Sequence, residues 1–346
     1  MIEKLIMKTN KLLSLALVAT GLLIANRAQS QDQVATVIKG SAQDASTLMT
    51  GYVGPALSIV GYGLNQGWYN TAKPHKLAGV DITATISAIS VPTSGLTYYV
   101  DNSKLNNLEL LNTSGGTATN GNVPTIFGKD EQPTYKIVST GTEFPGAQGI
   151  NLKKAMPVMS NSLPVPMAQL GFGLPKGFEL KARFVPTISF GDNKQSNFGM
   201  WGVGLMHDVK QYIPGIKFLP FDLSGFVGYT HLNFNSTFDA THNQKGKMTS
   251  NAFTIQAVIS KKISVLTGYA GIGYNIASTK ASINGDYNLN NDGATYTAVP
   301  LNMSASSNGP RATVGLRLKL AVFTLHGEYT IQKYNSLSLG FGISVR

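Results

Sequence analysis

The chain has 346 residues, and its formal net charge is +11. Hydrophobic residues make up 42% of it and charged residues only 13%, and 37 residues are glycine. It contains no cysteine, which excludes a disulfide-stapled scaffold, a thiol nucleophile and a cysteine metal site. The basic residues are dispersed, so their excess does not indicate nucleic-acid binding; attraction to anionic lipid headgroups or a cationic lumen explains it better. Outer-membrane β-barrels and secreted all-β domains both have this kind of composition.

The first thirty residues have the composition of an export signal. Three lysines precede an apolar core, Leu12–Ala25, and the small residues of Ala28-Gln29-Ser30 follow it. This order predicts a signal peptide over residues 1–30, cleaved near Ser30/Gln31. An N-terminal membrane anchor is the alternative, but the core is shorter than the roughly 20 residues of a membrane helix.

Residues 31–75 form a lead-in with weakly helical stretches and closely spaced glycines. The spacing of Gly61, Gly63 and Gly67 suggests a nucleotide-binding loop, but no Lys-Ser or Lys-Thr pair follows it, which argues against that function. Small residues let a backbone pack closely inside another structure. We therefore predict an N-terminal, partly helical hatch or plug over residues 31–75.

The first clear strand is Val80–Ala88, in which apolar and polar residues alternate. Leu96–Val100 is expected to return beside it. Residues 101–165 are rich in Asn, Thr, Gly and Pro, with short strand candidates only at Leu105–Leu111 and Tyr135–Val138. The pattern assigns no wall strand to this stretch.

From residue 168 the alternation becomes regular and predicts nine strands, over residues 168–174, 178–190, 198–206, 218–234, 252–260, 265–277, 311–320, 322–332 and 336–346. Every second connection is compact, whereas the intervening ones include two long, Asn/Ser/Gly-rich segments, 235–251 and 278–310. Compact turns at one end and long loops at the other are typical of outer-membrane barrels. A soluble secreted sandwich has no reason to sort its loops in this way.

The last strand, Ser336–Arg346, alternates without a break, at the length of a tilted strand that crosses a bilayer. We expect it to close the barrel by pairing with the first strand near Val80. An even strand number requires three or five strands before residue 168. The sequence thus predicts an all-β fold, a transmembrane antiparallel β-barrel of about 12–14 strands over residues 76–346.

The last three strands also predict which face is the lumen. Their apolar sets would face lipid, and Arg317, Lys319, His326 and Glu328 lie on the opposite face. A basic side chain that faces lipid at mid-depth costs about 2–4 kcal/mol, so these four side chains should point inward. The many Gly and Ser residues on that face indicate a lumen partly filled by another segment.

The five histidines give no enzymatic motif. The residues two positions after them are Leu77, Val209, Asn233, Gln244 and Glu328. None is Ser, so the His-x-Ser pair of barrel lipases and deacylases is missing, as is Gly-x-Ser-x-Gly. His326 and Glu328 are expected to form an inward polar pair, and His207-Asp208 to open a structured turn rather than a metal site. We expect no enzyme activity, no cofactor, and no catalytic, cofactor-binding or metal-ligating residue.

The sequence resembles two known families. The run Met200–Gly215, with Leu219–Asp222, and the N-terminal Gly67–Lys73 resemble an uncharacterised Bacteroidetes family of exported outer-membrane β-barrels, over most of the chain after the signal peptide. More remotely, the layout is similar to the long-chain fatty-acid transporter family, which has a signal peptide, an N-terminal hatch and a barrel. That hatch carries Asn-Pro-Ala where this chain has Asn70-Thr71-Ala72, so no ligand-contact residue is carried over.

Two functions fit these features. The first, which the transporter resemblance implies, is passive uptake of a small hydrophobic molecule, with an apolar pocket beside the plug and a lateral gap at a kinked strand; Pro186 and Gly268–Gly273 are the candidate kinks. The second is a non-transporting barrel that acts as a scaffold or accessory in secretion or surface attachment, with a filled lumen and exposed apolar patches on residues 101–165 and 278–310. The expected location is the bacterial outer membrane. The expected partners are outer-membrane lipid and, for the first function, a small hydrophobic ligand, without nucleic acid; no oligomeric state is predicted.

Overall fold

The computed structural model describes residues 41–113, 120–150, 162–191, 195–287 and 297–345. The predicted signal peptide and the first part of the predicted hatch lie outside these residues. Within them, no helix is long and apolar enough to cross a membrane.

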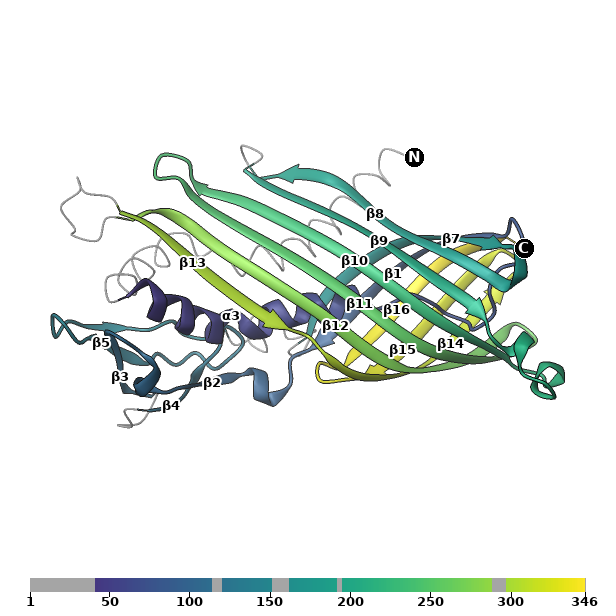
Figure 1. Cartoon of the computed structure of the whole chain (residues 1–346), viewed down its shortest axis with the longest axis horizontal. Helices are drawn as coiled ribbons and strands as arrows, with labels where there is room; N and C mark the ends of the chain where they lie inside the picture. Colours follow the sequence, from purple (N-terminus) through teal and green to yellow (C-terminus); the bar gives the residue numbers. More distant parts are fainter. Residues whose placement is uncertain (1–40, 114–119, 151–161, 192–194, 288–296, 346) are drawn as a thin grey trace.

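An eleven-stranded antiparallel sheet dominates the described part of the chain, and ten of its strands close into a ring (Figure 1). Around the ring these are β1 (Val80–Ser90), β7 (Ser162–Leu174), β8 (Phe178–Phe190), β9 (Ser196–Asp208), β10 (Asp222–Asp239), β11 (Gln244–Ile263), β12 (Leu266–Tyr287), β14 (Gly309–Leu320), β15 (Phe323–Ile331) and β16 (Ser336–Val345). The eleventh, β13 (Thr297–Ser306), pairs with the second half of β12.

The C-terminal strand closes the ring as predicted. β16 pairs with β1 in one continuous register, from Val80 opposite Val345 to Ile89 opposite Ser336. On its other edge β16 pairs with β15. The predicted fold class, an antiparallel β-barrel of the outer-membrane type with an N-terminal helix, is confirmed.

The strand number is a correction. All nine strands expected from residue 168 are present, but in the described residues β1 is the single wall strand before them, so the ring has ten strands rather than 12–14. The expected strand Leu96–Val100 and the candidates after it form two small sheets outside the wall: β2 (Thr97–Val100) with β4 (Gly121–Pro124), and β5 (Thr134–Ile137) between β3 (Leu108–Asn112) and β6 (Glu143–Pro145). Each has only three to five residues, too few for the roughly 9–11 that a membrane strand needs.

The ring has two unlike ends. The compact connections and the C-terminus lie at one end, which we call the compact-turn end (Figure 1). At the other, the tall end, β10, β11 and β12 run for 18, 20 and 22 residues, whereas β15 and β16 stop after 9 and 10. Of the predicted long loops 235–251 and 278–310, the residues that the structure describes are largely strand. Their sequences hid this because strands beyond the membrane do not need an apolar outer face.

Side chains alternate between a lipid-like exterior and a polar interior. Arg317, His326 and Glu328 are at most 8% exposed and point inward as predicted, and the Lys319 Nζ atom donates to Ser344 Oγ (3.0 Å). The opposite faces form the apolar belt, whose exposed members include Ile82, Ile86, Leu170, Phe172, Leu180, Phe184, Trp201, Val203, Ile255, Ile272, Val314, Leu316, Leu325, Ile331, Leu339 and Phe341. An apolar outside around a polar inside is the arrangement of a barrel that crosses a membrane.

Ring closure predicts a specific cross-link. Ser87 and Ser338 face each other across β1 and β16, with their Oγ atoms 2.8 Å apart. Because the chain has no cysteine, the double variant Ser87→Cys with Ser338→Cys should form one disulfide on oxidation. The fully denatured oxidised chain should then migrate faster on a non-reducing gel than the reduced one. The mismatched pair Ser87→Cys with Ser344→Cys is the control, and equal cross-linking of both pairs would contradict the register.

Candidate functional site

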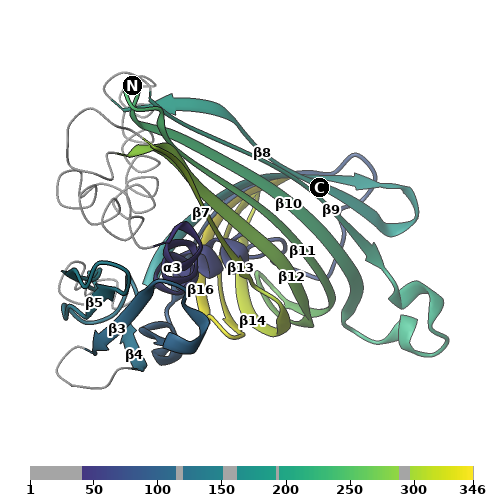
Figure 2. The same ribbon diagram turned by 60° about the vertical axis from the view of Figure 1, so that its left-hand side comes forward.

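A long helix leads into the ring from the tall end. Helix α3 (Ala42–Leu64) begins at Ser41, whose Oγ accepts from the Asp44 backbone N–H (3.3 Å), and it lies along β12 and β13 (Figure 2). A Cβ atom on Gly61 would lie 2.6 Å from Ser307 Oγ, and one on Gly63 would lie 2.7 Å from a Val165 methyl. These glycines therefore serve close packing, which is how the sequence was interpreted.

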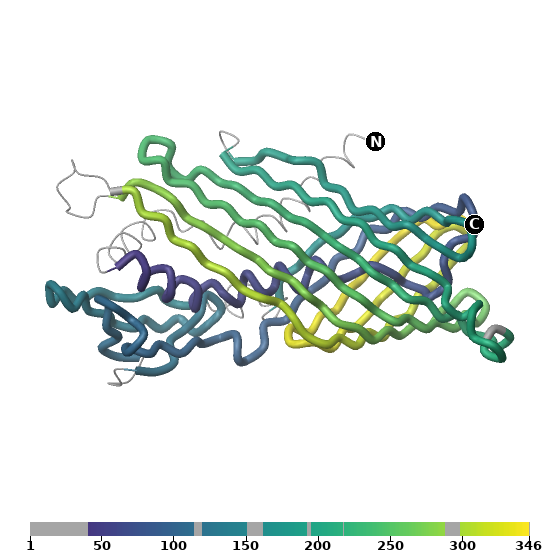
Figure 3. The backbone as a smooth tube through the Cα atoms, viewed as in Figure 1, coloured from purple at the N-terminus to yellow at the C-terminus, as the bar shows by residue number. Residues whose placement is uncertain are grey.

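Residues 65–79, which we call the lumen segment, continue from α3 through the ring to the compact-turn end (Figure 3). The Asn65 Nδ2 group donates to Phe253 O (3.1 Å), and the Ala72 backbone donates to Ser260 Oγ (2.9 Å). Trp68 and Tyr69 are 1% and 4% exposed and pack against aromatic and aliphatic side chains of the wall. The lumen is filled along this path.

Two arginines of the wall hold the junction between α3 and the lumen segment. Arg183 donates to the carbonyl oxygens of Leu64 (2.8 Å) and Gln66 (2.5 Å), and Arg311 donates to that of Asn65 (2.7 Å). The last carbonyls of a helix lack partners within the helix and carry its negative dipole end, so guanidinium groups are well placed there. We call Arg183 and Arg311 the arginine anchor.

The aromatic side chain of Trp68 completes this junction. The Arg183 Cζ atom lies 3.5 Å from the centre of a Trp68 ring, a cation–π contact. Glu328 accepts from the Gly67 backbone (3.3 Å) and from the Tyr269 hydroxyl (3.0 Å). Glu328 and His326, expected as a pair, thus have separate partners, and His326 lies 3.3 Å from Thr85 Oγ1. Sequence alone showed that these groups point inward but not that they meet the N-terminal segment.

At the compact-turn end, His75 joins a buried charged cluster. Its Nδ1 atom lies 3.1 Å from Glu179 and 3.8 Å from Asp81, and its Nε2 atom lies 3.1 Å from Ser344 Oγ. The Lys181 ammonium contacts the same Glu179, and the Arg317 charge acts on both carboxylates. Neither residue pattern nor spacing pointed to this cluster, since its members lie far apart in the sequence.

Two chemical roles for this cluster can be tested on its geometry. The ligand atoms of His75, Asp81 and Glu179 lie within 4.8 Å of one another, but Lys181 and Arg317 already balance the two carboxylates, so a divalent cation would add uncompensated buried charge. Ser344, His75 and Glu179 also follow the order of a serine-hydrolase triad. Ser344 is 2% exposed, and its Oγ atom accepts a hydrogen bond from the Lys319 ammonium. A substrate carbonyl therefore has no access to this hydroxyl. The arrangement is suited to fastening the lumen segment.

The wall is interrupted between β7 and β8 toward the tall end, where the two strands separate (Figure 2). Their pairing covers only the six positions from Leu174 opposite Phe178 to Gln169 opposite Arg183, although each strand continues for seven more residues. We call this unpaired stretch, residues 162–168 against 184–190, the lateral gap. The β8–β9 register also shifts between Val185 and Ile188, around Pro186, the kink that the sequence predicted.

The β7 edge of the lateral gap is depleted of hydrogen-bond donors. Gly173 exchanges both backbone hydrogen bonds with residues 78 and 79, so the odd-numbered residues of β7 bond toward β1 and the even-numbered ones face β8. Pro164 and Pro166 are even-numbered and have no N–H group. An unpaired N–H in hydrocarbon costs several kcal/mol, so two prolines make this edge tolerable within a membrane wall.

The interior changes character beside the lateral gap. On the compact-turn side of the gap, the inward positions of β7 and β8 are polar, with Gln169, Glu179, Lys181 and Arg183. A group of apolar side chains, which we call the apolar cluster, lies beside the gap and toward the tall end. Its members are Val60, Leu64, Val165, Met167, Val185, Phe190, Phe198, Met200, Leu232, Phe234, Met248, Ala252 and Ala277. It contains members from both edges of the gap. Its three methionines provide flexible, polarizable contacts of the kind that adapt to varied apolar ligands.

Comparison with known proteins places the chain in a family. Residues 7–345 match a family described as "Family of unknown function (DUF6588)". The chain belongs to this family. No match was found among curated proteins.

Several solved structures of outer-membrane proteins are similar to this fold. The translocator domain of the autotransporter NalP from Neisseria meningitidis is 11% identical, with a TM-score of 0.27, over 90% of this chain and 99% of that one. The transport unit of the autotransporter AIDA-I from Escherichia coli is 8% identical (TM-score 0.36; 86% and 98% covered), and the Ralstonia pickettii toluene transporter TbuX is 6% identical (TM-score 0.24; 85% and 94% covered). Scores this low carry no argument about function, which must come from the chain's own contacts.

The arginine anchor predicts a local loss of protection. Arg183→Ala should leave the end of α3 and the buried carbonyl of Gln66 without a charged partner, at a cost of about 2–4 kcal/mol. Hydrogen exchange of residues 60–70, followed by mass spectrometry, should then speed up while that of β15 and β16 stays slow. Lys262→Ala, which removes an exposed basic side chain and no contact with α3 or the lumen segment, is the control. Equal protection of residues 60–70 in wild type and Arg183→Ala would contradict the anchor.

Proposed function

We propose that this barrel exchanges small hydrophobic molecules between its interior and the surrounding bilayer through the lateral gap, as a passive importer of the bacterial outer membrane. The observation that carries the proposal is the coincidence of the gap with the apolar cluster. A water-filled pore has a polar lining, whereas here buried apolar side chains of the wall and of α3 lie beside the gap. It suits a ligand that leaves water on one side and enters lipid on the other.

The direction of transport follows from the two ends. We place the tall end outside the cell and the compact-turn end in the periplasm, since short periplasmic turns are the rule for such barrels. A hydrophobic molecule arriving from outside would pass α3, displace side chains of the apolar cluster and leave sideways between β7 and β8. The lumen segment and the charged cluster at His75 would meanwhile keep the axial route shut. No catalytic step, cofactor or nucleic acid is part of this proposal.

The orientation is testable because the chain has no cysteine of its own. Val138 is 55% exposed beside the small outer sheets, and Lys261 is exposed near the end of β11, at the compact-turn end. A membrane-impermeant maleimide added to intact cells should label Val138→Cys and spare Lys261→Cys. Lysed cells, in which both should react, are the control. The reverse pattern would contradict the orientation.

A disulfide across the base of the lateral gap tests the proposed route. Ala168 and Phe184 come next in register after the last pair, Gln169 with Arg183. In cells expressing Ala168→Cys with Phe184→Cys, oxidation should pin the strands together and lower uptake of tritiated palmitic acid severalfold, and a reducing agent should restore it. The control pair, Leu170→Cys with Ala182→Cys, lies within the intact pairing and should leave uptake unchanged.

The prolines offer a second way to narrow the gap. Pro164→Thr with Pro166→Thr restores two N–H donors that face β8, so β7 and β8 should pair further, and uptake should fall with slower hydrogen exchange in residues 184–190. Unchanged uptake in both the oxidised and the proline variants would refute the lateral route.

A non-transporting scaffold is the second candidate, and the filled lumen together with the outer sheets favours it. Strands β2–β6 enclose their own apolar core, which includes Leu48 of α3. The Asp44 carboxylate of α3 accepts from the backbones of Asn106, Asn107 and Leu108 at 2.7–3.0 Å, fixing this outer module to the helix. If palmitic acid uptake by wild type does not exceed that of cells without the protein, the importer proposal fails and the scaffold remains.

A further inference from the structure

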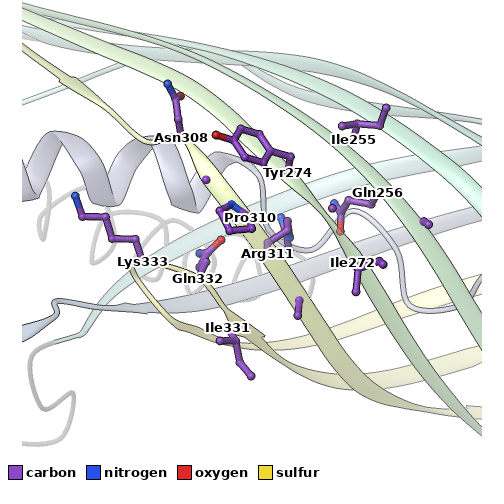
Figure 4. Close-up of a pocket in the computed structure, with 14 residues that line it drawn as sticks. Ile255, Gln256, Ile272, Tyr274, Asn308, Pro310, Arg311, Ile331, Gln332 and Lys333 are labelled. Atoms are coloured by element: carbon purple, nitrogen blue, oxygen red, sulfur yellow. The ribbon is translucent and has the colours of Figure 1, made fainter.

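A groove of about 1010 Å³ lies on the wall where β13 ends and β14 begins (Figure 4). β12 pairs with β14 as far as Asn275 and with β13 from Ser278 onward, so residues 307 and 308 leave the sheet between the two. There the Ser307 backbone donates to Ala277 O (2.8 Å), and Asn308 Oδ1 accepts from the Ala277 backbone (2.9 Å). This interruption of one wall strand creates the hollow.

The groove is amphipathic along its length. At one end it is lined by Ile255, Ile272 and Ile331, which are 50%, 68% and 59% exposed and belong to the apolar belt. Toward the tall end Asn308, Gln332 and Lys333 line it (Figure 4). Lys333 is exposed, and no ion pair of its ammonium group is found in the described residues. The groove thus crosses the outer border of the apolar belt, with a cation on the water side.

We infer that this groove binds one membrane lipid with a phosphate headgroup, its acyl chain along the isoleucines and its phosphate at Lys333. The three isoleucines belong to the apolar belt, so in a membrane they contact the hydrocarbon of the lipid. Apolar contact alone would not retain a particular lipid, because bulk lipid tails are as apolar as the wall. Selection therefore falls to Lys333, since a basic side chain near a membrane surface favours an anionic headgroup by about fivefold in affinity.

Native mass spectrometry of the full chain tests this inference. The protein is released from mixed micelles that contain either phosphatidylglycerol or phosphatidylcholine with identical acyl chains. Wild type should retain one anionic lipid in preference to the zwitterionic one. Lys333→Ala should weaken that preference by about fivefold. Lys245 is an exposed lysine at the start of β11, outside the groove, and Lys245→Ala should not change the preference.

A second variant keeps the test decisive if the first folds poorly. Ala312 faces outward within the groove, so Ala312→Trp should fill it and reduce retention of both lipids. Equal retention of the two lipids by wild type, equal effects of Lys333→Ala and Lys245→Ala, or full retention by Ala312→Trp would each overturn the lipid site. Binding of inorganic phosphate at Lys333 without retained lipid would also overturn it. None of these outcomes bears on uptake through the lateral gap.

Discussion

The structure depends on the requirement that backbone polar groups be paired wherever the chain meets hydrocarbon. Ring closure by β1 and β16 satisfies this over most of the circumference. The two interruptions are then informative. At the lateral gap, prolines remove donors from the exposed edge, and at the β13–β14 break, hydrogen bonds of residues 277, 307 and 308 bridge the discontinuity. Both are built features of the wall rather than defects in it.

Most of the buried charged side chains of the wall lie where they bind the N-terminal segment. The arginine anchor meets the end of α3, and the cluster around Glu179 and Lys181 meets His75 near the exit. Buried charges of this kind are costly unless paired, and here the pairs link segments more than a hundred residues apart in sequence. Their effect is to hold the lumen segment in one position within a wall that could otherwise enclose an open channel.

For the proposed function, the question is which boundary of the barrel a small hydrophobic molecule could cross. Along the axis, aromatic packing at Trp68 and the charged clusters oppose passage. Sideways, β7 and β8 are not paired with each other over residues 162–168 and 184–190, beside the apolar cluster. A molecule that prefers hydrocarbon meets less opposition on the second route, because it leaves no charged or hydrogen-bonding group unpaired on the way. A polar solute would meet more opposition on the lateral route, because it would have to enter an apolar cluster and then hydrocarbon.

Sequence by itself determined the repeating pattern: the nine strands from residue 168, the compact turns at one end, the inward position of Arg317 and Glu328, and Pro186 as a kink. Period-2 alternation reports this directly, because each position faces either lipid or lumen. Only the tertiary structure decided the strand number, since β2–β6 carry strand-like residues but pair among themselves. Only it placed Arg183 at the end of α3 and set the polar extensions of β10–β13, because these depend on partners distant in the chain and on surfaces that no longer touch lipid.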